Sequence, residues 1–135
     1  MLKQIIKRDG TVELYTPSKL NKWAMWATDS LGDRVDWSGV VLDALSNCKE
    51  TEKSQNLQKE LINACLYKKD WPHNVMAGKL YAAWLHKNTF GDKMPTVMQM
   101  QFNLIEIGLC IDMGYTVGEY AEIEKIIDHT RDFNY

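Results

Sequence analysis

Apolar residues recur every three or four positions in several segments after residue 16, which is the spacing of one face of an α-helix. Thr16 is a capping residue type, Pro17 occupies the favoured first helical position, and Gly32 follows the end of the first segment. The apolar positions of this segment are Leu20, Trp23, Ala24, Ala27 and Leu31. The spacing restricts the chain to a mainly helical fold.

The same reasoning predicts five further helices. They cover about residues 38–47, a stretch that starts at Ser54, a stretch from 71 to 91, residues 96–108, and a last helix that opens at the capping box Thr116-Val117-Gly118-Glu119. Residues 49–53 are compatible with either a short strand or a loop. The middle helices are expected to bury Leu57, Leu61, Ala64, Cys65, Met76, Leu80, Ala83 and Trp84.

Residues 2–15 predict a β-hairpin, because two β-rich runs flank Asp9-Gly10, a pair that favours a two-residue turn. Such a turn pairs Arg8 with Thr11, Lys7 with Val12, and Ile6 with Glu13. Alternation then places Lys7 on the helix-facing side, together with Ile5, Val12 and Leu14. An inward lysine either extends its ammonium group into water near the hairpin tip or meets an anion there.

Two other lysines raise the same question. Lys87 continues the apolar stripe of the helix that ends near residue 91, and Lys19 lies two turns before Trp26 on one flank of the first helix. An unpaired buried ammonium group is costly, so a shared anion such as a polyphosphate would explain the inward lysines. A surface lysine that extends into solvent is the alternative for each.

Composition limits the class of protein. The chain has 135 residues, 45% of them hydrophobic, and a net charge of −2, which fits one globular domain with a small extension and gives no field that attracts nucleic acid. We expect a cytoplasmic protein that does not enter membranes, because no apolar run approaches the length of a membrane helix. Cys48, Cys65 and Cys110 lack metal-site spacing and are expected to be small packing residues, with no metal bound.

One run of residues resembles a known regulatory module. Ile5-Ile6-Lys7-Arg8-Asp9-Gly10, followed by Glu13 and then by Lys19-Leu20, closely resembles the opening of the ATP-cone domain. That domain occurs at the N-terminus of ribonucleotide reductases and in a related repressor of their genes. Residues 80–91 look like its last helix, and residues 127–132 resemble the segment that precedes the catalytic barrel of class I large subunits. The resemblance favours the reductase, since no zinc-ribbon cysteines precede the cone.

The resemblance implies an architecture and a division of the chain. A small N-terminal sheet or hairpin covers a four-helix bundle, and two further helices follow, which gives a mainly α fold of the α+β type. Residues 1–91 form the ATP-cone regulatory domain, and residues 92–135 form a helical segment that leads to a catalytic barrel absent from this sequence.

The resemblance also implies a binding site for ATP or dATP, bound with Mg²⁺, between the hairpin and the helices. Phosphate or ribose contacts fall on four basic residues, and the remaining positions lie near the base, the hairpin cover or the nucleotide. The implied nucleotide-binding residues are Lys7, Arg8, Glu13, Thr16, Lys19, Ser54, Gln58 and Lys87. Trp26 matches an aromatic that stacks on a second nucleotide in some relatives. Gln58 replaces a frequent histidine.

The implied function is overall control of a ribonucleoside-diphosphate reductase, in which ATP and dATP set how the large and small subunits assemble. The chain is not expected to catalyse the reaction by itself, because the radical and redox cysteines belong to the barrel. Its expected partners are an adenine nucleotide, the catalytic part of the large subunit, in the same chain or a separate one, and the small subunit. A different possibility is a ligand-free helical module, derived from an ATP-cone, that binds another protein through its last helices. The repressor is a third possibility, and the charge disfavours it.

Overall fold

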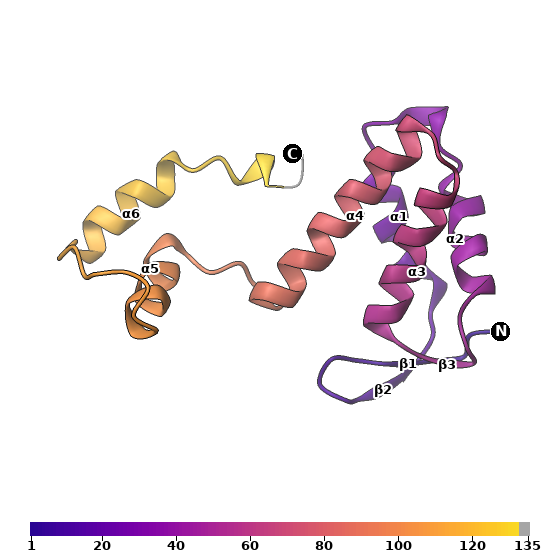
Figure 1. Ribbon diagram of the computed structural model, residues 1–135, viewed down its shortest axis with the longest axis horizontal. Coiled ribbons are helices and arrows are strands. Elements are labelled where there is room, and N and C mark those ends of the chain that lie inside the picture. Colours follow the sequence, from indigo (N-terminus) through magenta and orange to yellow (C-terminus); the bar gives the residue numbers. More distant parts are fainter. Residues whose placement is uncertain (133–135) are drawn as a thin grey trace. The chain divides into compact units, whose positions relative to one another are not determined.

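The computed structural model describes residues 1–132. It divides into two compact units, residues 1–85 and the residues from 86 onward, and we describe each by itself. Helices dominate, and a single three-stranded sheet lies near the N-terminus of the described chain (Figure 1). The predicted fold class, mainly α with a small N-terminal sheet, is confirmed.

The elements that begin in the first unit follow the predicted order. They are β1 Gln4–Ile6, β2 Val12–Leu14, α1 Pro17–Thr28, the short 3₁₀ turn Gly32–Arg34, α2 Trp37–Ser46, β3 Thr51–Lys53, α3 Ser54–Tyr67 and α4 Trp71–Phe90. Residues 49–53, which were compatible with a strand or a loop, contain the strand β3.

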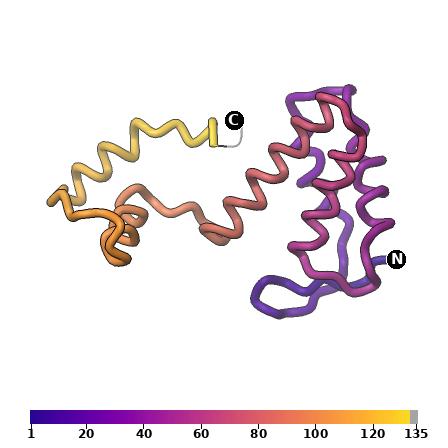
Figure 2. Tube along the Cα trace, viewed as in Figure 1, coloured from indigo at the N-terminus to yellow at the C-terminus, as the bar shows by residue number. Residues whose placement is uncertain are grey.

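The sheet has the order β2, β1, β3. β1 is antiparallel to β2 and parallel to β3, with Gln4 opposite Thr51 and Ile6 opposite Lys53. The backbone trace in Figure 2 follows the hairpin at one end of the first unit and the return of the chain from α2 through β3 into α3. A strand that leads directly into α3 therefore holds the hairpin against the start of that helix.

The core of the first unit is formed by the apolar faces of its helices and by the inner side of the sheet. Leu61, Met76 and Leu80 are fully buried, and Ile5 contributes from β1. The buried stripes predicted for α1 and α3 are confirmed at Leu20, Ala24, Ala27, Leu31, Leu57, Leu61, Ala64 and Cys65. Trp23 and Trp84 are partly buried and pack against this core.

Two of the predicted helix caps differ in detail. Thr16 is the N-cap residue of α1, but its side chain makes no capping hydrogen bond. Ser54 is the first residue of α3 rather than its cap, which is Lys53. Both arms of the predicted capping box at Thr116 and Glu119 are present.

The second unit contains α5 Val97–Glu106, α6 Val117–Ile126 and the 3₁₀ turn His129–Arg131. Tyr120 of α6 is buried beside Phe102 and Tyr115, with ring centroids 6.1 and 5.7 Å away. A capping box at Thr96 and Gln99, which the sequence analysis missed, starts α5. Over residues 1–132, no helix combines the length and apolar character that a membrane crossing requires.

Candidate anion site at the hairpin

The hairpin has a different register from the predicted one. Ile6 lies opposite Val12 and Ile5 opposite Glu13, and the Lys7 N–H donates a 2.8 Å hydrogen bond to the Thr11 carbonyl. The connection is therefore a three-residue loop, residues 8–10, and the predicted two-residue turn is wrong.

Local chemistry explains the longer loop. The Asp9 carboxylate accepts hydrogen bonds from the Thr11 backbone N–H at 2.9 Å and from the Thr11 hydroxyl at 2.7 Å. The Gly10 N–H donates to the Lys7 carbonyl at 3.0 Å, and Gly10 adopts a φ of +85°, in the region that glycine tolerates best. A turn followed by a residue with positive φ is a common three-residue hairpin connection.

A shift of one residue turns every side chain of β2 to the opposite face. Val12 and Leu14, which were predicted to face inward, are 58% and 73% exposed, so that prediction is wrong. Glu13 takes the place predicted for them, on the same side as Ile5 and Lys7. The register therefore places a carboxylate beside Lys7, whose side chain is exposed.

The Glu13 carboxylate contacts two ammonium groups. Its Oε2 lies 2.8 Å from Nζ of Lys7, and its Oε1 and Oε2 lie 2.9 and 3.1 Å from Nζ of Lys19, in the first turn of α1. The glutamate side chain is 30% exposed, whereas those of Lys7 and Lys19 are 46% and 68% exposed. One carboxylate thus links the hairpin to α1.

These contacts shift the pKa values of Glu13 and Lys7 toward their charged forms. Hydrogen bonds from Lys7, then from Lys19, hold the pKa of the Glu13 carboxyl below its ordinary value of 4.5. The hydrogen bond to Glu13, followed by the attraction of its charge, raises the pKa of Lys7 above 10.5. At neutral pH the cluster therefore carries two positive charges and one negative charge.

The hairpin loop also reaches α3. A guanidinium nitrogen of Arg8 donates a hydrogen bond to the side-chain oxygen of Gln58 at 3.2 Å. Gln58 lies one turn after Ser54, which is half-buried at the start of the helix. Five of the residues implied by the resemblance therefore make contacts with one another in two groups, Lys7, Glu13 and Lys19 in one, and Arg8 and Gln58 in the other.

Other implied residues lie outside these two groups of contacts. Thr16 is exposed at the N-cap of α1, and Trp26 lies toward the end of the same helix, with 38% of its surface exposed. Lys87 belongs to the second unit, where its ammonium group lies 3.3 Å from a carboxylate oxygen of Asp92. The assignment of all of these residues to a nucleotide, those within the two groups of contacts included, stays a prediction.

One aromatic contact was missed by the sequence analysis. Nζ of Lys59 lies 5.4 Å from the ring centroid of Trp84, a favourable cation–π arrangement. The Trp84 ring also lies 5.6 Å from that of Tyr81, and its buried Nε1 has no hydrogen-bond partner. Lys59 and Trp84 lie on different helices, so no spacing within one helix could reveal the pair.

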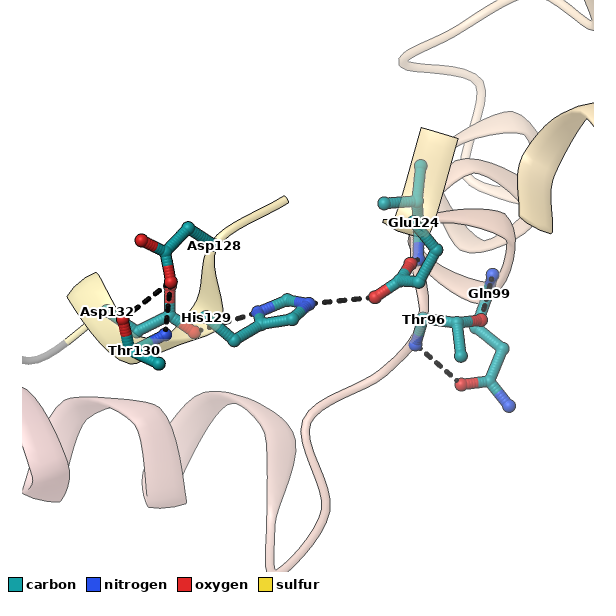
Figure 3. A network of polar contacts seen from close by, with 8 residues as sticks. Thr96, Gln99, Glu124, Asp128, His129, Thr130 and Asp132 are labelled. Atoms are coloured by element: carbon teal, nitrogen blue, oxygen red, sulfur yellow. Dashed lines mark hydrogen bonds and ion pairs between the residues drawn. The ribbon is translucent and has the colours of Figure 1, made fainter. Parts of the chain in front are cut away.

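A second polar cluster lies in the second unit (Figure 3). His129 Nε2 is 2.8 Å from Glu124, and Nδ1 is 3.0 Å from Asp132. The other Glu124 oxygen accepts the Val97 N–H at 2.7 Å, at the start of α5. The carboxylate of Asp128 accepts hydrogen bonds from the backbone N–H and the hydroxyl of Thr130 and does not pair with the neighbouring His129.

Neither cluster is arranged as a metal site. Within the part of the chain that the structure describes, no group of three or more histidine, cysteine, aspartate or glutamate side chains is placed to hold a metal ion. All three cysteines are free, and burial raises the pKa of Cys65 to about 12 and that of Cys48 to about 11. Both thiols therefore stay protonated at neutral pH, which suits a packing role.

The hairpin cluster has the chemistry of an anion site. Lys7, which follows β1, and Lys19 of α1 bring two ammonium groups together, and Arg8 is the next residue after Lys7 in the hairpin loop. Ammonium and guanidinium groups form their strongest hydrogen bonds with carboxylate and phosphate oxygens. The carboxylate of Glu13 lies between the two lysines.

Two curated relatives are similar to almost the whole chain. The ribonucleoside-diphosphate reductase subunit alpha of Buchnera aphidicola subsp. Acyrthosiphon pisum (strain APS) is 27% identical over 97% of the chain, and that of subsp. Schizaphis graminum (strain Sg) is 25% identical over 97%. The chain spans 18% of the length of each relative. It is a weak homologue of one part of that subunit. No protein-family model matches the chain.

Proposed function

We propose that the chain is the N-terminal, nucleotide-sensing part of a ribonucleoside-diphosphate reductase large subunit, and that it binds ATP and dATP as allosteric effectors. The observation that carries the proposal is the meeting of Lys7 and Lys19 at one carboxylate of the hairpin, with Arg8 next to Lys7 in the loop and in contact with Gln58. The similarity to two reductase alpha subunits supports the same context.

The cationic groups are suited to the phosphates of a nucleotide. Lys7 and Lys19 would bind phosphate oxygens as point charges, and Arg8 would offer the planar fork that matches two oxygens at once. Gln58, already in contact with Arg8, would orient that fork. A Mg²⁺ ion bound to the nucleotide would neutralise the phosphate charge that these residues leave uncompensated.

The proposed regulation follows from linkage. A nucleotide shifts assembly only if it binds the two assembly states with different affinities, and ATP and dATP have opposite effects only if the 2′-hydroxyl contributes to that difference. The proposed partners are the catalytic part of the large subunit and the reductase small subunit. On this proposal the chain senses the nucleotide and leaves the chemistry to the barrel.

Titration calorimetry of the whole chain with ATP, dATP and GTP tests the proposal. We expect both adenine nucleotides to bind, and we expect Lys7→Ala to weaken ATP binding by about tenfold, because it removes a charge-assisted contact. Lys68→Ala is the matched control: Lys68 also pairs with one carboxylate, at 2.7 Å from Asp43, but lies at the end of α3. An equal loss in the two variants would contradict the assigned site.

One observation favours a second candidate function, the ligand-free interaction module. The second unit exposes several large apolar side chains on and between α5 and α6, which are Ile107, Leu109, Ile111, Val117 and Ile126. Exposed apolar groups of this kind are typical of protein-binding surfaces. A folded sample that binds no nucleotide at millimolar concentration would favour this candidate over the first.

A further inference from the structure

The further inference concerns the role of Glu13 in the proposed anion site. Two ammonium groups, from Lys7 and Lys19, each lie within about 3 Å of the same carboxylate. Like charges repel, so two ammonium groups converge in this way only around an anion. Here that anion is the side chain of Glu13.

The position of Glu13 depends on the fold. In the predicted two-residue turn, Val12 would have occupied the inward face and no carboxylate would lie between the lysines. The three-residue loop turns β2 over, sets Glu13 opposite Ile5 and places it beside Lys7. Since Lys19 comes from α1, the same carboxylate also joins two separate elements.

A carboxylate and a terminal phosphate group present similar surfaces to lysine. Both offer negatively charged oxygens that accept short hydrogen bonds from ammonium groups. They differ in charge, because a terminal phosphate carries close to two negative charges at neutral pH and a carboxylate carries one. A phosphate can therefore displace a carboxylate from a pair of lysines, whereas a monovalent anion has no such advantage.

We propose that Glu13 is an internal counter-ion, which pairs with Lys7 and Lys19 and must leave both before a phosphate group can bind them. The inference rests on the proposed function, since it assigns a regulating residue to the same site. Glu13 keeps the two lysines close together in the absence of ligand, lowers the affinity for every anion, and leaves polyphosphates as the preferred ligands.

The test compares Glu13→Gln with the parent chain in calorimetric titrations against inorganic tripolyphosphate and against ATP. Glutamine keeps the size of the side chain and removes its charge. We expect Glu13→Gln to bind both ligands about three- to tenfold more tightly, the range set by the loss of two partly exposed ion pairs. The gain should be the same for the two ligands, because the competition concerns the phosphate oxygens and not the base.

Glu50→Gln is the matched control. Glu50 also pairs with a lysine, Lys3, and the substitution changes the net charge by the same amount, but this pair lies away from the loop. It should leave both affinities within twofold of the parent chain. Far-ultraviolet circular dichroism of each variant shows whether it is folded, and Glu13→Ala provides a second removal of the charge.

The outcomes separate the inference from the proposed function. Tighter binding of tripolyphosphate and ATP by Glu13→Gln supports both. If the parent chain binds ATP, and Glu13→Gln binds tripolyphosphate no more tightly than the parent chain does, the counter-ion role of Glu13 is wrong and the proposed sensing function stands. Weaker ATP binding with unchanged tripolyphosphate binding means that Glu13 contacts the base instead, which also overturns the inference. If neither chain binds either ligand, both proposals fail.

Discussion

Leu61 offers the clearest test of how the helices support the hairpin site. It is fully buried in α3, one turn after Gln58, which contacts Arg8. Replacing a buried leucine with alanine costs about 2–5 kcal/mol, and the cost is higher where the surroundings cannot collapse into the cavity. Because Leu61 has no exposed surface and lies among packed helices, we expect Leu61→Ala to cost about 3–4 kcal/mol.

That loss is large relative to the stability of the unit. A unit of 85 residues has an unfolding free energy of roughly 4–13 kcal/mol at typical values per residue. With a urea dependence of about 1 kcal/mol per molar for a unit of this size, the midpoint of unfolding should fall by about 3 M. Leu61→Ala therefore removes a quarter or more of the stability of the first unit.

The assay is urea unfolding followed by tryptophan fluorescence. All five tryptophans lie between residues 23 and 84, so the signal reports on the first unit alone. Leu66→Ala is the matched control, because it deletes the same atoms from the same helix at a position that is 50% exposed. It should cost less than about 1 kcal/mol. Equal losses in the two variants would refute the assignment of Leu61 to the core.

Two further predictions concern the hairpin and the second unit. Gly10→Ala should destabilise the first unit by about 1 kcal/mol, because Gly10 has a φ of +85°. Gly78→Ala should stabilise the same unit by about 0.8 kcal/mol, because Gly78 lies in a helix and the added carbon would meet open space. The same urea assay measures both changes. Hydrogen bonds to Glu124 and then to Asp132 raise the pKa of His129 above 6.5. The contribution of these bonds to the stability of the second unit is therefore complete below pH 6.5 and is lost as the pH rises through the raised pKa. Hydrogen bonds from the Val97 N–H and then from His129 lower the pKa of Glu124 below 4.5. Their contribution to the stability of the second unit is therefore present above pH 4.5 and is lost as the pH falls through the lowered pKa. The second unit should be most stable between these limits, and an NMR titration of the His129 ring with a midpoint at or below 6.5 would contradict the cluster.

The sequence predicted the helices well because their signals are local. Pro17, the apolar spacing of α1 and the Thr116 capping box each act within one or two turns, and the structure places all three as expected. Thr96 shows that the same method can still miss a signal, since Thr96 and Gln99 form a capping box that was present in the sequence.

The candidate site was predicted less completely. The resemblance named Lys7, Arg8, Glu13, Lys19 and Gln58, and the structure joins Lys7 and Lys19 through Glu13 and joins Arg8 to Gln58. The contacts of Glu13 with Lys7 and Lys19 could not be derived, because a turn signal of Asp9-Gly10 is compatible with loops of two or three residues. The Lys59 and Trp84 contact was also missed, since it joins two helices.

The sequence by itself determined the mainly helical character, the existence of a hairpin and the main buried stripes, because each depends on residues that are neighbours along the chain. Only the tertiary structure decided the hairpin register, and with it whether Val12 or Glu13 faces Lys7. The physical reason is that strand pairing is satisfied equally by adjacent registers. Both of them leave Ile5 facing the core, but only the observed one places Glu13 beside Lys7 and Lys19.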